Sequence, residues 1–312
     1  MKYGILLISF IVSTIGFKAQ QDLQFTHFKE YALFYNPAYA GVSNDICGDI
    51  IGRNQWTGFD GAPRSLFFDI RYATNKLHGG VGLTVVSDEL GFRKTTAVTA
   101  SYAYKKSFPN IGTLYIGASI GMNKAMWKGN FIPPETFNDP NIPISGQSAS
   151  VFNSNVGLYY RKKHLFMGLS TTNVNQGVFN IGGLSQFNFN TVRHYYVLAG
   201  YKTRLSQLVE LEPSILAKSD AVSTQIDVKA KAIFSNQLFG GVNYRLGDAI
   251  SPILGMYIPG NNFKLTVSYS YDITTSDLRN YSSGSHEIAI SFCKKIPALT
   301  QRHDDPRDLG GH

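Results

Sequence analysis

A two-residue alternation of apolar and polar side chains is the feature that most constrains this sequence. In residues 224–233, TQIDVKAKAI, an apolar series of Ile, Val and Ala alternates with a polar series of Gln, Asp and Lys. Residues 263–272, FKLTVSYSYD, and 65–72, SLFFDIRY, alternate in the same way. Because successive side chains of an extended strand point to opposite faces, each segment is predicted to be a strand with one apolar face.

The same pattern recurs along the chain about 14 times, with boundaries uncertain by about 2–4 residues. No helical period separates the segments. The predicted strands are 46–56, 64–73, 79–87, 94–105, 112–127, 150–161, 165–172, 193–204, 209–218, 224–233, 238–245, 249–257, 263–271 and 285–293.

Two all-β architectures use strands of this kind, a soluble sandwich and a transmembrane barrel. Many segments have the length of about 9–11 residues that a tilted membrane strand needs, whereas sandwich strands are commonly about 5–6 residues long. Charged residues make up only 16% of the chain and aromatic residues 13%. Soluble domains carry about 25% charged residues. Length and composition therefore favour an antiparallel outer-membrane β-barrel of about 14 strands.

The connections between the predicted strands support a barrel with both termini on the periplasmic side. Alternate connections are short, and the long connections all fall in the other set, as barrels with short turns at one end require. The long connections are 128–149, 173–192 and 272–284.

The two ends of the chain differ from the middle. Residues 1–20 combine Lys2 with an apolar run from Ile5 to Ile15, which predicts a cleaved signal peptide, the alternative being a core element. We expect a periplasmic segment at 21–44, the barrel at 45–293 and a polar periplasmic tail at 294–312. Beyond residue 20 the sequence holds no apolar run long enough for a membrane helix.

The charges and motifs indicate little chemistry. The net charge of +8 is modest and forms no basic block, so nucleic acid is not expected as a partner. No nucleophile motif, spaced His/Cys set or phosphate loop is present, so we expect no enzyme activity, metal or cofactor. The odd or even position of a residue in its strand decides which face its side chain joins, and we call this its parity. Parity directs eight charged side chains into the lumen, where they either fill it through mutual pairing or line a selective channel. They are Arg53, Asp69, Arg71, Asp227, Lys229, Lys231, Lys264 and Glu287.

The two cysteines fall at the seam of the predicted barrel. Cys47 opens the first strand and Cys293 closes the last, and parity points both side chains inward. An oxidising periplasm would allow a disulfide there. Because disulfide geometry is strict, two free thiols remain the alternative.

Three blocks of the sequence resemble the PorP/SprF family of type IX secretion system membrane proteins from Bacteroidota. They are LFYNPAYAG (33–41), RNQWTGFDGAPRS (53–65) and YSYDITTSDLRNYSSGSHEIAISF (269–292). The resemblance covers essentially the whole mature chain. The residues that carry it are Asn36, Pro37, Tyr39, Gly41, Arg53, Gln55, Trp56, Gly58, Asp60, Gly61, Pro63, Tyr271, Asp272, His286 and Glu287.

The resemblance implies an outer-membrane barrel that supports protein export, surface attachment and, in gliding species, motility. We expect the barrel itself to be monomeric. Its implied partners are a secreted adhesin's C-terminal domain, periplasmic lipoproteins of the secretion system and membrane lipid. A porin or a transporter of hydrophobic solutes is the alternative function, and a barrel enzyme is the weakest candidate.

Two aperiodic stretches carry hypotheses of their own. Residues 21–41 hold several aromatic side chains that need burial, so we expect the segment to plug the periplasmic mouth of the barrel, the alternative being an exposed lead-in. A short helical turn in EYALFY (30–35) would end before Pro37. GFDGAP (58–63) is predicted to be a tight turn, and Trp56 and Phe59 beside it are candidates for a partner contact.

Overall fold

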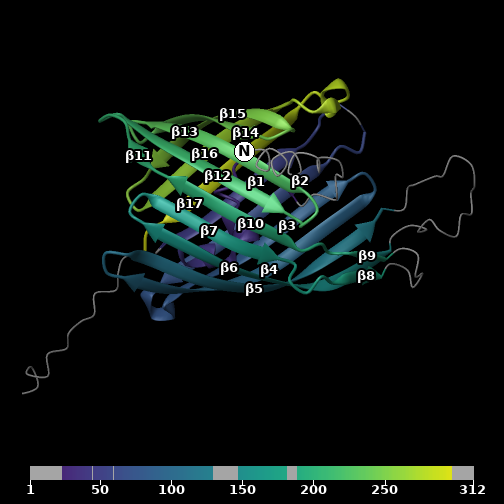
Figure 1. The fold of residues 1–312 in the computed structure, drawn as a ribbon, viewed down its shortest axis with the longest axis horizontal. Helices are drawn as coiled ribbons and strands as arrows, with labels where there is room; N and C mark the ends of the chain where they lie inside the picture. The colour runs from purple at the N-terminus through teal and green to yellow at the C-terminus, as the bar shows by residue number, and fades with distance from the viewer. Residues whose placement is uncertain (1–22, 44, 59, 129–146, 181–187, 297–312) are drawn as a thin grey trace, which may run out of the picture.

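The computed structural model describes residues 23–43, 45–58, 60–128, 147–180 and 188–296. In these ranges the chain forms a closed antiparallel barrel of tilted strands, with a short helical segment inside it (Figure 1). The barrel closes because the first strand, β1 (Ile46–Asn54), pairs along its length with the last, β17 (Ser285–Lys294). No helix in the described part of the chain is long and apolar enough to cross a membrane.

The wall of the barrel consists of 14 antiparallel strands, as the sequence predicts. The sheet has 15 strand segments, but β10 (His194–Tyr201) and β11 (Thr203–Arg204) follow one another and both pair with β12, so they act as one interrupted strand. The remaining strands are β2 (Arg64–Thr74), β3 (Gly79–Leu90), β4 (Arg93–Phe108), β5 (Gly112–Trp127), β6 (Ser148–Lys162), β7 (Leu165–Thr172), β12 (Val209–Ser219), β13 (Thr224–Phe234), β14 (Leu238–Arg245), β15 (Ala249–Pro259) and β16 (Phe263–Thr274).

The two faces of the wall have the polarity of a membrane barrel. In β2, Leu66 and Ile70 are about half exposed on the outside, while Asp69 and Arg71 are buried inside. A soluble sandwich would bury the apolar face instead. Of the eight charged side chains that parity directs inward, seven are buried. The eighth, Lys264, lies exposed at one end, where its ammonium group sits 3.8 Å from the centre of the Tyr257 ring.

The barrel has two unlike ends, which we call the turn end and the loop end. The turn end holds the start of β1, the end of β17 and only short connections, of which the longest are 75–78 and 205–208. The loop end holds the long connections 55–63, 128–147, 173–193 and 275–284. Two of them contain structure of their own, the hairpin of β8 (Val178–Asn180) with β9 (Asn188–Asn190) and the 3-10 turn η4 (Asp277–Asn280). The long connections therefore gather at one end, as the sequence predicts.

Several predicted regions lie outside the described residues. These are the signal peptide at 1–20, most of the tail at 294–312, Phe59 and most of the connection 128–149.

Residues 23–43, which we call the internal segment, lie inside the barrel (purple in Figure 1). The segment contains one helical turn, α2 (Ala32–Tyr35), and a 3-10 helix, η1 (Pro37–Gly41). The two meet at Asn36, whose Oδ1 accepts a hydrogen bond from the Ala38 backbone N–H at 3.0 Å. An Asn cap followed by Pro at the first helical position is a favoured way to start a helix, so the sequence NPA sets this bend locally.

The internal segment reaches further than the sequence predicts. Instead of occupying only the mouth at the turn end, it extends to Thr26 and His27, which bond to Glu287 beside the loop-end half of β1. The aromatic side chains explain the length of this path. Phe25, Phe28 and Tyr35 are all buried in one cluster with lumen-facing rings of the wall.

Candidate functional site

The internal segment is attached to the barrel by three ionic clusters, and these attachments form the candidate site. The first centres on Glu287. One carboxylate oxygen accepts hydrogen bonds from the Thr26 backbone N–H at 2.9 Å and from Arg53 Nη1 at 2.9 Å. The other accepts the His27 backbone N–H at 2.8 Å and lies 2.6 Å from His27 Nδ1. A single carboxylate thus fixes the start of the internal segment to the seam of the barrel.

A chain of alternating charges continues the Glu287 cluster across the wall. Arg53 Nη2 lies 2.6 Å from Asp272, and Arg245 bridges Asp272 at 3.2 Å to Asp227 at 2.9 Å. Thr26 also donates its hydroxyl to Asp272 at 2.9 Å. All four charged groups are buried. Buried charges are tolerated where each has a partner of opposite sign and further hydrogen bonds, and this arrangement supplies both.

The second cluster holds the middle of the internal segment. Glu212 lies between Lys29 of the segment, at 2.8 Å, and Lys231 of the wall, at 3.2 Å. Lys229 places its ammonium group 3.8 Å from the centre of the Phe28 ring, which is a close cation–π contact. Burial lowers the pKa of Lys29, and the neighbouring Glu212 carboxylate partly opposes this shift.

Glu30 of the internal segment contributes a negative charge to the second cluster. Burial acts to raise the pKa of Glu30, but the cations around it, led by Lys229 and Lys231, lower the pKa to about 2. The carboxyl group is therefore ionised at neutral pH. It offsets the positive charge that three lysines bring into this part of the lumen.

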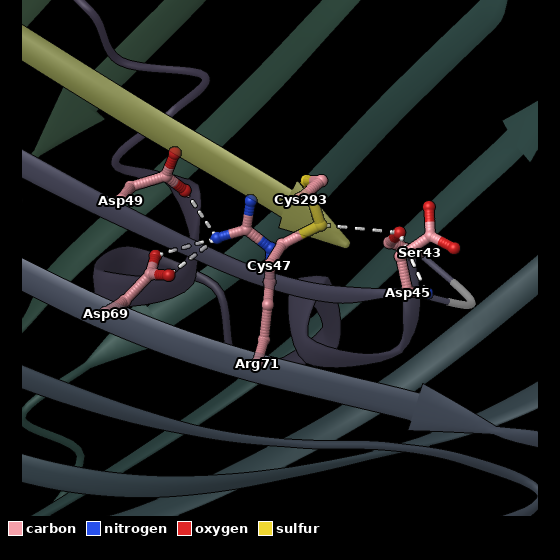
Figure 2. The surroundings of a disulfide bond; sticks show 7 residues. All are labelled: Ser43, Asp45, Cys47, Asp49, Asp69, Arg71 and Cys293. Carbon is pink, nitrogen blue, oxygen red and sulfur yellow. Dashed lines mark hydrogen bonds and ion pairs between the residues drawn. A yellow bond between two sulfur atoms is a disulfide. The ribbon is translucent and has the colours of Figure 1, made fainter. Parts of the chain in front are cut away.

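The third cluster lies at the turn end beside the seam. Arg71 Nη1 bonds to Asp49 at 2.5 Å and to Asp69 at 2.7 Å, and its guanidinium carbon sits 5.2 Å from the centre of the Tyr39 ring. Figure 2 shows the guanidinium group between the two carboxylates. Burial raises the pKa of Tyr39 to about 12, so this phenol is neutral and serves as a packing surface.

A disulfide joins the first and last strands next to this cluster (Figure 2). Cys47 and Cys293 are directly opposite in the register of β1 and β17, and their sulfur atoms are 2.08 Å apart. The sequence left a bonded pair and two free thiols open; in this structure they are bonded. The disulfide thus joins β1 to β17 at the turn end of the seam, while Arg71 links β2 to Asp49 of β1 and to Tyr39 of η1.

Two glycines of the wall create the space in which η1 lies. A Cβ atom added to Gly117 would come within 2.2 Å of the Ala38 backbone nitrogen, and one added to Gly80 within 2.2 Å of the Ala40 oxygen. Both contacts are impossible for a real Cβ, so the backbone of η1 packs directly on the backbone of the wall. Asn36 adds a hydrogen bond from its Nδ2 to the Leu158 oxygen at 3.0 Å. Gly41 is buried as well, and a Cβ there would approach Tyr115 to 3.0 Å.

The second sequence block spans the end of β1, the connection 55–63 and the start of β2. Gly58 and Gly61 have φ angles of +118° and +81°, which glycine adopts without strain. The Gln55 backbone N–H donates to the Pro63 oxygen at 2.9 Å and closes the turn, while Asp60 is exposed. Trp56 is half-buried and its backbone N–H donates to the Ser285 hydroxyl at 3.0 Å. Turn chemistry accounts for these contacts, and Trp56 joins the turn to the start of β17.

Tyr271 and His286 from the third block do not reach the lumen. They lie on the outer face, where the Tyr271 hydroxyl donates to the Ser283 oxygen at 2.7 Å and the two rings are 5.0 Å apart. His286 Nδ1 also lies 2.7 Å from the Tyr269 hydroxyl. The predicted motif residues therefore divide among the internal segment, the lumen, one loop and the outer wall, and only Arg53, Asp272 and Glu287 meet in one cluster.

The sequence prediction missed six residues of these clusters, which are Thr26, His27, Lys29, Glu30, Glu212 and Arg245. Parity within β14 places Arg245 on the lumen face, so that residue was available to the same reasoning. Nothing in the sequence indicates that Thr26 and His27 contact Glu287, because the contacts use backbone N–H groups 260 and 261 positions away. Among the described residues, no group of three or more His, Cys, Asp or Glu side chains is placed to hold a metal ion.

Comparison with known proteins yields one family and several similar folds. The profile of the family described as type IX secretion system membrane protein PorP/SprF matches residues 17–292. No curated protein matches the chain. Of the solved structures, the TodX deltaS2S3 mutant monoaromatic hydrocarbon channel is similar with a TM-score of 0.51 and 9% identity, over 85% of this chain and 94% of that one.

Two further channels give lower scores. The CymD monoaromatic hydrocarbon channel has a TM-score of 0.46 and 12% identity, over 90% of this chain and 95% of that one. A Pseudomonas aeruginosa FadL homologue has a TM-score of 0.44 and 12% identity, over 85% and 93% respectively. At these identities the likeness to solved structures is one of fold.

Proposed function

The chain belongs to the PorP/SprF family of type IX secretion system membrane proteins, and we propose that it works by binding partners of that system and not as an open pore. The observation that carries this proposal is the internal segment. It runs through the lumen from the loop-end half to the turn end and is fixed there by three ionic clusters. A solute path through the barrel would require the segment to leave, which breaks the Lys29–Glu212 pair and the bonds of Thr26 and His27 to Glu287. A hydrogen bond to a charged group contributes about 1.5–3 kcal/mol, so together these contacts oppose opening.

The two ends of the barrel offer different surfaces for partners. We place the turn end in the periplasm and the loop end outside the cell, because outer-membrane barrels have short periplasmic turns and longer outer loops. In this orientation the loop end would receive the C-terminal domain of a secreted adhesin, and the turn end would receive periplasmic lipoproteins. Support for export, surface attachment and gliding would follow from these contacts.

Charge supports a protein or lipid contact at the turn end. Among the described residues, the exposed charged side chains of this end are basic, and a basic surface favours partners with acidic patches. The exposed basic residues there are Lys76, Lys106, Arg161, Lys162, Lys163, Arg204, Lys264, Lys294 and Lys295.

Photo-crosslinking in cells tests both contacts. A photoreactive amino acid replaces Tyr281 at the loop end, which is 76% exposed, or Leu208 at the turn end, which is 66% exposed. The matched control is Ile120, which is 61% exposed on the outer face in the middle of β5 and should meet only lipid. We expect a secreted protein to be captured at position 281 and a periplasmic component of the secretion system at position 208.

Conductance in planar bilayers tests the alternative function, a porin or solute transporter. A barrel that binds partners should show little current while the internal segment is in place. Steady conductance, or uptake of an apolar solute, together with no secretion component captured at either position would instead indicate a porin or solute transporter.

A further inference from the structure

A cavity of about 160 Å³ lies between the internal segment and the loop end, and we call it the cup. Its wall comes from the loop-end halves of β3 to β7 and carries amide and hydroxyl side chains, chiefly Asn123, Asn153 and Thr172. Leu23 and Phe34 of the internal segment form its apolar side. The three ionic clusters that hold the internal segment do not use these wall residues, so the segment's attachment does not explain their polarity.

Two polar atoms of the cup lack a partner. Asn153 and Thr172 are only 8% and 3% exposed, yet within the described part of the chain Asn153 Oδ1 and Thr172 Oγ1 have no hydrogen bond. Asn153 Nδ2 donates to Asn123 Oδ1 over a long 3.4 Å. A buried polar group without a partner costs about 1–3 kcal/mol, so such a group marks a place where a ligand can supply the missing bond.

The apolar side of the cup is a supported aromatic ring. Phe34 stacks on Tyr31 with ring centres 4.7 Å apart and planes at 19°. Tyr31 in turn meets the Phe67 ring edge-on at 5.0 Å. The Phe34 ring is therefore held in place before any ligand arrives, which reduces the entropy lost on binding.

The charges near the cup are already engaged. The Asp88 carboxylate accepts a hydrogen bond from the Ser65 hydroxyl at 2.6 Å, and the Arg93 guanidinium carbon lies 5.8 Å from the centre of the Phe189 ring. The rest of the lining is neutral. A ligand for this site should therefore be uncharged, able both to donate and to accept hydrogen bonds, and partly apolar.

We propose that the cup is a binding site for one ring of a neutral sugar. Sugar hydroxyls donate and accept, which matches the amides of Asn123 and Asn153 and the Thr172 hydroxyl. The C–H face of a sugar ring suits an aromatic surface such as Phe34. An apolar solute would leave Asn153 Oδ1 unpaired. An added peptide strand would meet an edge where β6 extends beyond its pairing with β7, but Val174 and Asn175 already bond there to Ser154 and Phe152.

Titration of the purified full-length barrel by ligand-observed NMR tests this site. The protein is kept in a detergent without a sugar headgroup, because such a headgroup would compete. The probes are methyl α-D-mannoside, methyl α-D-glucoside, acetyl-trialanine amide as a neutral peptide, and toluene as an apolar solute. We expect saturable binding of at least one glycoside with a dissociation constant on the order of 1 mM, as few ligand atoms make contact.

Three substitutions locate the binding. Asn153→Leu and Thr172→Val keep the volume and remove the hydrogen-bonding groups, and each should weaken glycoside binding at least tenfold. Asn262→Leu makes the same chemical change at the turn end, where Asn262 is exposed, and should leave binding unchanged. Folding of each variant is checked by its heat-dependent migration on a gel.

The outcomes separate cleanly. Glycoside binding that is lost in either cup variant and kept in Asn262→Leu supports the proposal. Binding of neither glycoside by the folded wild-type protein overturns it. Preferential binding of toluene or the peptide overturns it too, as does glycoside binding that survives in the cup variants. The result does not depend on any secretion partner.

Discussion

Replacing Glu287 with Gln should release the start of the internal segment while leaving the barrel closed. In the folded protein the Glu287 carboxylate accepts from two backbone N–H groups, of Thr26 and His27, and from Arg53. Gln keeps the shape of the side chain but loses the charge and one acceptor. Its NH₂ group would face either the Thr26 N–H together with the Arg53 guanidinium group, or the His27 backbone N–H, and all of these are donors.

The size of the effect follows from the burial of the cluster. Glu287 and Arg53 side chains are each 1% exposed. Arg53 belongs to the wall and loses this partner whether or not the segment is in place, so the cost to the segment comes from its own bonds to Glu287. A hydrogen bond to a charged group contributes about 1.5–3 kcal/mol, and the carboxylate charge strengthens two such bonds, from the Thr26 and His27 backbone N–H groups. A loss of about 3 kcal/mol corresponds to roughly a 150-fold increase in the open population of the segment, at 1.36 kcal/mol per factor of ten.

Amide hydrogen exchange measured by mass spectrometry reports this opening peptide by peptide. Peptides covering 23–35 should exchange about two orders of magnitude faster in Glu287→Gln than in the wild type, provided that opening and closing are faster than exchange. Peptides from β4 to β6 should be unaffected, since these strands do not contact Glu287.

A surface pair provides the control. Glu89 and Lys128 form an ion pair whose side chains are 38% and 41% exposed, so Glu89→Gln should cost less than about 1 kcal/mol and leave exchange of the internal segment unchanged. The reasoning is refuted if the segment exchanges equally slowly in Glu287→Gln and the wild type. It is also refuted if the barrel strands and the segment open together, because the segment would then not be a separate unit.

Three further predictions follow from other contacts. The Cys47–Cys293 disulfide closes a loop with a sequence separation of 246, so Cys47→Ser with Cys293→Ser should lower the free energy of unfolding by up to about 5 kcal/mol on the chain-entropy estimate. Urea titration of the detergent-solubilised barrel measures this loss against the oxidised wild type, and the reduced wild type should behave like the double variant. The pKa of Glu30 is lowered to about 2 from an ordinary 4.5, which contributes up to about 3 kcal/mol to the free energy of unfolding. This contribution is complete above pH 4.5 and is lost as the pH falls towards 2. Glu30→Gln should therefore flatten the dependence of the free energy of unfolding on pH in that window, and an unchanged slope would contradict the electrostatic role. Gly117→Ala should displace η1, because its Cβ would fall 2.2 Å from the Ala38 nitrogen, whereas Gly52→Ala, with nothing within 4 Å, should not; exchange of the peptide covering 36–43 distinguishes the two.

The period of the sequence predicted the wall of the barrel well. Alternation alone assigns each side chain of β2 or β13 to the lumen or to the lipid face, because the two-residue period of a strand is fixed by backbone geometry. The sorting of long and short connections then predicted which end would carry the loops. The single strand expected at 193–204 is interrupted at Lys202, where the structure divides it into β10 and β11.

The same reasoning could not predict the partners of the lumen charges. Parity directs Arg53 and Glu287 inward, and their register across the seam pairs them, but it does not reveal that Glu287 also binds Thr26 and His27. Nor does it show that Glu212 bridges Lys29 and Lys231. These contacts depend on where an aperiodic segment stops inside the barrel. The bulk of its aromatic rings and the Gly80 and Gly117 backbones determine that position.

The charges in the lumen and the internal segment therefore depend on one another. Without the segment, Glu212 would be the nearest acid to both Lys229 and Lys231 in this part of the lumen. Two cations would then share one carboxylate. The segment contributes Glu30, whose ionised form is stabilised by those lysines, and the Phe28 ring beneath the Lys229 ammonium group. A wall built for an open aqueous channel would not need buried cations that match an acid and a ring at fixed positions. The pattern of charges in the wall thus favours a barrel whose working state keeps residues 23–43 in place.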